Sequence, residues 1–317
     1  MKDLKVVFMG TPEFAVPVLK SLINNCNVIL VVSQPDREKD RKGNLLFTPT
    51  KKVAMEEGIP VLQLENIRKE YDKVLEYNPD IIVTCAYGQI VPTAVLDFSK
   101  YGAINVHGSL LPKYRGGAPI HHAIINGDKE TGITIMYMDK GMDSGDIISQ
   151  ESLPILDDDN LDSIYNKMSL LGASLLIKTL PSIIDGTNER IKQDETKVTF
   201  AYNISKDDEK LNFNMKANDV FNKIRGLSSV PGSYAMLKGL RVKIYSSYVT
   251  NIKSNSIPGK IEKIDKNGIY VSTNDYLIAL TDIKIEGKKR CFVKDFINGI
   301  RKEEYEGEIF YNEWFFR

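Results

Sequence analysis

The residues with the clearest chemical potential are Asn105 and His107, at the end of a short apolar run, INVH. Side chains two residues apart on a strand point to the same face, about 7 Å apart along it. A carboxamide and an imidazole that project together can donate hydrogen bonds to an oxyanion or move a proton. The alternative is a core histidine satisfied by a backbone carbonyl, which the shared face with Asn105 makes the less favoured interpretation.

Three carboxylates lie in a glycine-rich turn, MDKGMDSGDI at residues 138–147. Asp and Gly favour turns for local reasons, so a plain hairpin would explain them. Their spacing does not fit an EF-hand calcium loop. One of Asp139, Asp143 and Asp146 could instead reach His107 and hold its proton, and the sequence pattern leaves the choice open.

The elements that must position these groups alternate between strand and helix. The sequence predicts strands at residues 5–9, 28–33, 80–86, 101–107 and 132–138, and helices at 11–23, 49–57 and 161–180. Such alternation predicts an α/β domain, a mostly parallel Rossmann-like sheet with helices on both faces and ligands at its carboxyl edge. The first turn reads GTPEFA and lacks two glycines of the dinucleotide fingerprint, which disfavours a nicotinamide or flavin enzyme.

The pattern changes after a polar stretch that follows the last predicted helix. Short alternating strands at residues 241–248, 259–264, 268–272 and 276–285 predict a small C-terminal β-barrel of the OB-like kind. We therefore predict a catalytic domain at 1–189, a linker at 190–205 and a barrel domain at 206–317. Residues 206–302 carry nineteen Lys or Arg against ten Asp or Glu, which suggests a polyanionic partner, while a solvated lysine-rich surface would explain the composition equally well.

Composition excludes several classes of protein. No apolar run approaches the roughly 20 residues of a membrane span, and the N-terminus has no secretory signal pattern. The three cysteines, Cys26, Cys85 and Cys291, form no C-x-x-C pair, and no metal-ligand motif occurs. A cytoplasmic protein without a metal is the expectation.

Four segments together resemble the folate-dependent formyltransferase family. They are INVHGSLLPKYRGG at 104–117, AYGQIVP at 86–92, SQPDREKDRKGN at 33–44 and GMDSGD at 141–146. The resemblance continues in order through QDETKVTFA at 193–201 and IPGKI at 257–261. It implies transfer of a formyl group from 10-formyltetrahydrofolate to an amine, and the S-Q-P-D-R loop with the basic barrel favours the amine of initiator methionyl-tRNA.

The resemblance also assigns residues by position. It implies that Asn105, His107 and Asp143 are catalytic, with Asp143 orienting His107 and the other two stabilising the oxyanion. It places the folate pocket on Ser109, Leu110, Leu111, Pro112, Tyr87, Gly88, Ile90, Val91 and Pro92. It places tRNA contacts on Arg41 and Lys42, to which the charge of the barrel adds Lys238, Lys243 and Lys260. A monomer that needs no membrane is expected.

Two alternatives share part of this pattern. Another member of the superfamily, acting on a sugar nucleotide or hydrolysing formyl-folate, would keep the three catalytic residues but would not need a basic barrel. An RNA-binding protein with a degenerate α/β domain would need the barrel but not the intact trio.

Overall fold

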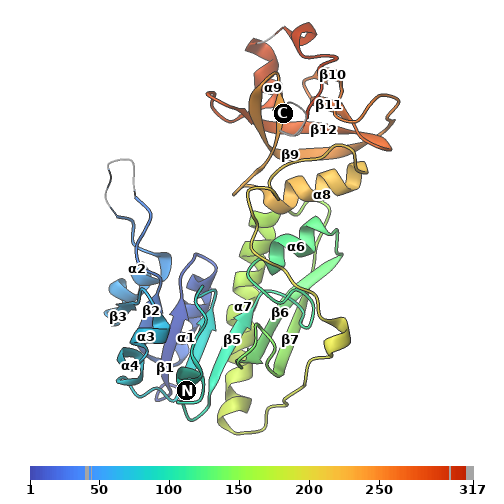
Figure 1. Ribbon diagram of the computed structural model, residues 1–317. Helices are drawn as coiled ribbons and strands as arrows, with labels where there is room; N and C mark the ends of the chain where they lie inside the picture. Colours follow the sequence, from blue (N-terminus) through green and yellow to red (C-terminus); the bar gives the residue numbers. More distant parts are fainter. Residues whose placement is uncertain (40–42, 44, 300, 312–317) are drawn as a thin grey trace. The chain divides into compact units, whose positions relative to one another are not determined.

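The computed structural model describes residues 1–39, 43, 45–299 and 301–311 (Figure 1). The chain divides into two compact units. The first unit comprises residues 1–119, 130–154 and 165–202, and the second comprises 120–129, 155–164 and the chain from 203 onward.

A seven-stranded sheet organises the first unit, in the order β3-β2-β1-β4-β5-β6-β7. The strands are β1 (Lys5–Gly10), β2 (Asn27–Ser33), β3 (Val61–Gln63), β4 (Ile81–Cys85), β5 (Ala103–His107), β6 (Glu130–Tyr137) and β7 (Ile147–Pro154). The first five strands in this order, from β3 to β5, run parallel to one another. β6 is antiparallel to β5, and β7 is antiparallel to β6. The near-continuous apolar runs of β1 and β4 bury both faces of these central strands, as parallel sheets require. The predicted mostly parallel α/β fold is confirmed.

Helices follow the strands of this sheet. They are α1 (Ala15–Asn25), α2 (Pro49–Glu56), α3 (Ile67–Glu70), α4 (Asp72–Leu75), α5 (Thr93–Leu96), α6 (Pro119–Ile125) and α7 (Leu161–Ile184), with a short turn η1 (Glu195–Lys197). A Cβ at Gly172 of α7 would lie 3.0 Å from Val106 of β5, so the helix packs closely on the sheet. Although no apolar run of membrane-spanning length was found in the sequence, α7 is long and apolar enough to cross a membrane by length and composition. Half of that stretch is buried in the fold.

The second unit contains a six-stranded antiparallel sheet. Its strands are β8 (Ser233–Leu237), β9 (Leu240–Lys253), β10 (Ile261–Asp265), β11 (Gly268–Ser272), β12 (Tyr276–Ile285) and β13 (Cys291–Phe292), and its helices are α8 (Ala217–Leu227), α9 (Val293–Phe296), η2 (Ile297–Gly299) and η3 (Lys302–Glu304). Residues 308–311 close this sheet, because Tyr311 exchanges two backbone hydrogen bonds with Met236 of β8 while Phe310 donates to Gly259 beside β10. The predicted small C-terminal β-barrel is confirmed.

The structure differs from the predicted boundaries in two places. Residues 190–202, expected in a linker, pack within the first unit, where Ile191 exchanges two backbone hydrogen bonds with Ile147. Residues 120–129 and 155–164 belong to the second unit. There the buried Arg225 of α8 donates to the carbonyl oxygens of Leu156 and Asp159. Backbone pairing places residues 190–202 in the first unit, and a buried guanidinium holds residues 155–164 in the second. Neither kind of contact leaves a periodic pattern in the sequence.

Candidate active site

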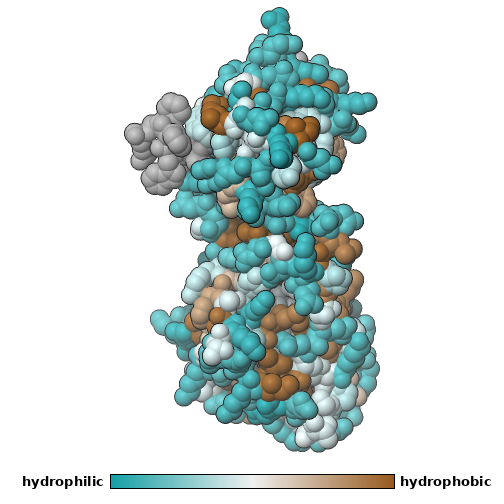
Figure 2. All heavy atoms as spheres, turned by 90° about the vertical axis from the view of Figure 1, so that its right-hand side faces the viewer, coloured by the Kyte–Doolittle hydropathy of each residue, from teal (hydrophilic) through white to brown (hydrophobic). Residues whose placement is uncertain are grey.

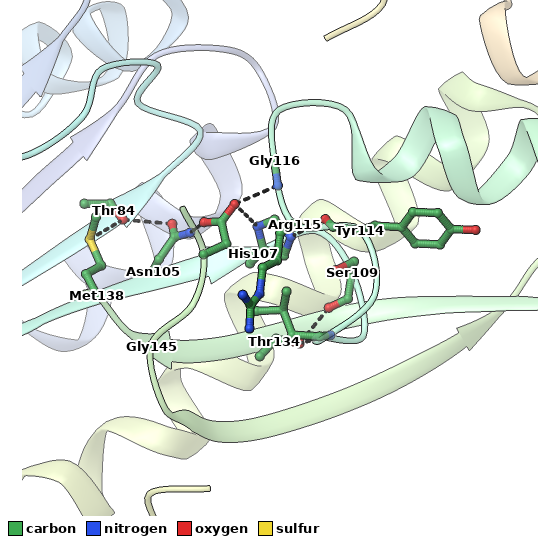
Figure 3. Close-up of polar contacts among 12 residues, drawn as sticks. Thr84, Asn105, His107, Ser109, Tyr114, Arg115, Gly116, Thr134, Met138 and Gly145 are labelled. Carbon is green, nitrogen blue, oxygen red and sulfur yellow. Dashed lines mark hydrogen bonds and ion pairs between the residues drawn. The ribbon is translucent and has the colours of Figure 1, made fainter. Parts of the chain in front are cut away.

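Asn105 and His107 lie on β5, which is the last parallel strand and pairs with β4 on one side and β6 on the other. Thr84 of β4 is the register partner of Asn105. Both β5 side chains project to the same side of the sheet and meet the carboxylate of Asp143 (Figure 3). Side chains two residues apart on a strand share a face, as expected from the sequence, and the carboxamide and the imidazole therefore reach the same carboxylate.

The carboxamide of Asn105 is held in one orientation. Thr84 Oγ1 donates to Asn105 Oδ1 at 2.8 Å, and Asn105 Nδ2 donates to Asp143 Oδ1 at 3.4 Å. A carboxylate can only accept, so the NH2 end must face Asp143 and the oxygen must face the hydroxyl. The second N–H of Nδ2 has no hydrogen-bond partner among the described residues. Because Asn105 is partly exposed, that N–H can reach a ligand.

The buried ring of His107 lies between two oxygens. Its Nε2 is 3.0 Å from the carbonyl oxygen of Tyr114, which can only accept, so this nitrogen carries the hydrogen. Its Nδ1 is 3.6 Å from Asp143 Oδ2, within ion-pair range but longer than a hydrogen bond. Both ring nitrogens face acceptors, an arrangement that suits a ring able to donate from either side.

Asp143 is the carboxylate that the turn supplies to this group. Its Oδ2 also accepts from the backbone N–H of Gly116 at 2.9 Å, and its side chain is 20% exposed. Asp139 instead accepts from Gly141 N and Ser144 Oγ within the turn. Asp146 pairs with Arg190. The geometry thus separates three carboxylates that the sequence pattern left equivalent.

The two segments expected to line the folate pocket follow β4 and β5 directly. Their accessible members, those exposed or partly exposed, are Gly88, Ile90, Pro92, Leu110 and Pro112, and their buried members are Tyr87, Val91, Ser109 and Leu111. The Ser109 hydroxyl donates to the Lys113 carbonyl, and the Leu111 amide donates to Thr134 Oγ1. The buried members therefore shape this loop from within, and only the accessible members present side-chain or Cα surface to a ligand.

The lysines predicted on the barrel are each paired with an acid. Lys238 lies 3.5 Å from Glu308, Lys243 lies 3.8 Å from Glu209 and Lys260 lies 3.9 Å from Glu262. Four glutamates at 303, 304, 306 and 308 lie just beyond the basic segment and lower its excess from nine positive charges to five. Arg41 and Lys42 lie outside the described residues.

Three other lysines on the barrel are exposed and have no ion pair among the residues that the structure describes. Lys284 lies at the end of β12, and Lys288 and Lys289 follow it in the next turn. On the face drawn in Figure 2 the surface is mostly hydrophilic, with hydrophobic side chains in separate areas. These three lysines are better placed than the paired ones to meet an external anion.

Within the described ranges, no group of three or more His, Cys, Asp and Glu side chains could hold a metal ion. Cys85, at the end of β4, is fully buried, and burial raises the pKa of its thiol well above the ordinary value.

Comparison with known proteins decides the family. Residues 4–180 match the formyl transferase family, and residues 203–301 match the formyl transferase C-terminal domain. The chain belongs to the formyl transferase family. This formyl transferase is 48% identical over 298 residues to methionyl-tRNA formyltransferase of Staphylococcus aureus strain MW2, with 93% of the chain and 96% of the relative covered. The protein of the same name from strain Newman is 47% identical over the same length.

Solved structures share the fold of this formyl transferase. The sugar 3N-formyl transferase WlaRD superposes with a TM-score of 0.66 at 22% identity, covering 91% of this chain and all of the other. An N-formyltransferase from Helicobacter canadensis gives a TM-score of 0.65 at 23% identity, covering 88% of this chain and 99% of the other. At these identities the likeness concerns the fold.

Several residues around the site were not identified from the sequence. Thr84 had a signal, since it is a lone hydroxyl in the buried strand IIVTC. Arg115, Gly116 and Gln193 lie in segments that carry the family resemblance, but no role was assigned to them, because they act on groups far away in the sequence. These three contacts appear only when the chain is folded.

Proposed function

We propose that this formyl transferase moves the formyl group of 10-formyltetrahydrofolate to the α-amino group of initiator methionyl-tRNA and so supports translation initiation. The observation that carries the proposal is the match over 93% of the chain, through both units, to relatives named for that reaction. The grouping of Asn105, His107 and Asp143 supplies the chemistry.

The amide of Asn105 is the proposed oxyanion donor. Attack of the amine on the formyl carbon forms a C–N bond and puts negative charge on the formyl oxygen before the bond to N10 breaks. A preorganised donor aimed at that oxygen is commonly worth about 3–4 kcal/mol. Asn105 fits because one N–H of Nδ2 is uncommitted while Thr84 and Asp143 fix the group's orientation.

The pair of His107 and Asp143 is the proposed route for the proton. The attacking amine must lose one proton and N10 must gain one, so the net transfer needs a group that accepts and then donates. Asp143 is partly exposed and touches His107, so it can take the proton or stabilise a charged ring. Direct donation from His107 Nε2 to the oxyanion would require release of the Tyr114 carbonyl.

The accessible apolar members of the folate segments fit the ring faces of the co-substrate. Ile90 is 68% exposed and follows β4, while Leu110 and Pro112 follow β5, beyond His107. Apolar walls beside a few fixed polar groups are typical of sites for small ligands. When bound there, the folate would supply the formyl group, and these side chains would hold it beside Asn105.

The barrel is the proposed tRNA-binding domain, and the first unit is the proposed catalytic domain. Support comes from the exposed Lys284, Lys288 and Lys289, which can neutralise phosphates and give affinity without sequence preference. Lys238, Lys243 and Lys260 stay in the proposal with smaller roles, since each already has an acidic partner. The loop with Arg41 and Lys42 is proposed to meet the acceptor end.

We further propose that the enzyme acts as a monomer in the cytoplasm, without a membrane. The close packing of α7 on the sheet supports a role for that helix inside the fold.

A comparison of acceptors tests the proposal. Purified protein is incubated with 10-formyltetrahydrofolate and one of methionyl-tRNA, free methionine or an amino-sugar nucleotide, and the formylated product is measured. We expect product with methionyl-tRNA only. Formylation of the sugar nucleotide in preference to methionyl-tRNA would assign the chain to a different reaction within the family.

A further inference from the structure

A polar segment at residues 191–201 joins the two loops that build the site. Ile191 exchanges backbone hydrogen bonds of 2.8 and 2.9 Å with Ile147, just after the turn that carries Asp143. Further along, the Arg115 amide donates to Thr199 O at 2.9 Å and the Ala201 amide donates to Arg115 O at 2.8 Å. One stretch of chain, which includes η1, therefore holds both the loop with Gly116 and the turn with Asp143.

The side chain of Gln193 connects these loops directly. Its Nε2 donates to the carbonyl oxygens of Asp143 and Gly145, each at 2.8 Å, and its Oε1 accepts from Arg115 Nε at 3.0 Å. Carbonyls only accept and a guanidinium only donates, so the amide cannot flip. Gln193 and Arg115 are both buried, and the Arg115 guanidinium also pairs with Glu195 Oε1 at 2.8 Å. Water therefore competes little for these bonds.

The backbone that Gln193 holds is in an unusual conformation. Asp143 has φ of +50°, in the left-handed region that residues other than glycine seldom adopt. Such a residue keeps this conformation only where its surroundings impose it. In that conformation its carboxylate meets Gly116 N, His107 and Asn105 together. Release of the backbone would let the carboxylate leave all three.

We propose that Gln193, braced by Arg115, is a positioning residue for formyl transfer: it holds the Asp143 backbone so that the carboxylate reaches His107 and Asn105. The inference rests on the proposed function of Asp143 and deepens it. Gln193 touches no reacting group in this scheme, so it acts on the rate only through Asp143.

The informative variant is Gln193→Glu, which has the same length. A carboxylate still accepts from Arg115 but presents an oxygen, not an NH2, to the two carbonyls. We expect kcat to fall at least about tenfold while KM for folate and for tRNA stays within about twofold. The matched control is Glu195→Gln, on the exposed side of Arg115, which should leave kcat within about twofold. If Gln193→Glu does not fold, Arg115→Lys takes its place as the test. It removes the bond from Arg115 Nε to Gln193, keeps a positive charge and should also lower kcat.

A double-mutant cycle separates positioning from a general structural role. In the Asp143→Asn background, Gln193→Glu should change the single-turnover rate by less than about twofold, because residues acting as one unit are not additive. A further tenfold loss in that background, or wild-type kcat in the single variant, would overturn the inference. Wild-type kcat in Asp143→Asn alone would instead overturn the proposed role of Asp143.

Discussion

Replacement of Asp143 by Asn changes the centre of the site while nearly preserving its shape. The carboxylate accepts from Gly116 N at 2.9 Å and Asn105 Nδ2 at 3.4 Å and lies 3.6 Å from His107 Nδ1. An amide has only one accepting oxygen, so its NH2 must face one of these donors. Loss of one charge-assisted hydrogen bond and of the ion pair amounts to about 2–4 kcal/mol, or roughly 30- to 1,000-fold in turnover.

Steady-state formylation of methionyl-tRNA, with folate binding measured beside it, checks this estimate. The control is Asp139→Asn in the same turn, where an amide oxygen can still accept from Gly141 N and Ser144 Oγ. We expect that control to stay within about twofold of wild type. Turnover of Asp143→Asn within about threefold of wild type, or a larger loss in Asp139→Asn, would show that the Asp143 carboxylate does not act in formyl transfer.

Three further outcomes follow from the contacts. Thr84→Val, which removes the hydroxyl that orients the reacting amide, should lower kcat about fivefold, and Thr84→Ser should restore it. Burial lowers the pKa of His121 to about 4 from 6.5, so its contribution to stability is fully present above pH 6.5 and is lost as the pH drops towards 4. The free energy of unfolding measured in urea should therefore fall by at most about 2 kcal/mol between pH 7 and pH 5, and His121→Asn should remove that fall. Replacement of Lys284, Lys288 and Lys289 by Glu should weaken tRNA binding at least about tenfold at low salt and make it less dependent on salt, because fewer phosphates are neutralised. Folate binding should stay unchanged. Unaltered tRNA binding would remove these lysines from the proposed surface.

Local patterns predicted much of the fold. The strands at 268–272 and 276–285 match β11 and β12 residue for residue, because alternating apolar residues and flanking turn residues mark both. The short β3 and the closing segment 308–311 were not predicted. The three partly buried residues of β3 and the closing stretch, which begins at the last of four glutamates, carry no periodic signal. Their place is set by backbone pairing with distant strands.

The site was predictable where it depends on one strand. The period of two was enough to put Asn105 and His107 together, but the choice among three aspartates needed the turn's conformation. Gln193 shows the limit most clearly. It lies 50 residues from Asp143, in a polar stretch without periodicity, and its partners on that turn are backbone carbonyls, which no side-chain pattern indicates.

In the proposed reaction, the Asn105 amide stabilises the oxyanion formed during formyl transfer to methionyl-tRNA. Single-turnover transfer from 10-formyltetrahydrofolate, compared between wild type and Asn105→Ala at saturating substrates, tests it most directly. We expect a rate at least about 100-fold lower in the variant, with the Kd for folate within about threefold of wild type. A variant that transfers the formyl group within about threefold of the wild-type rate would contradict it.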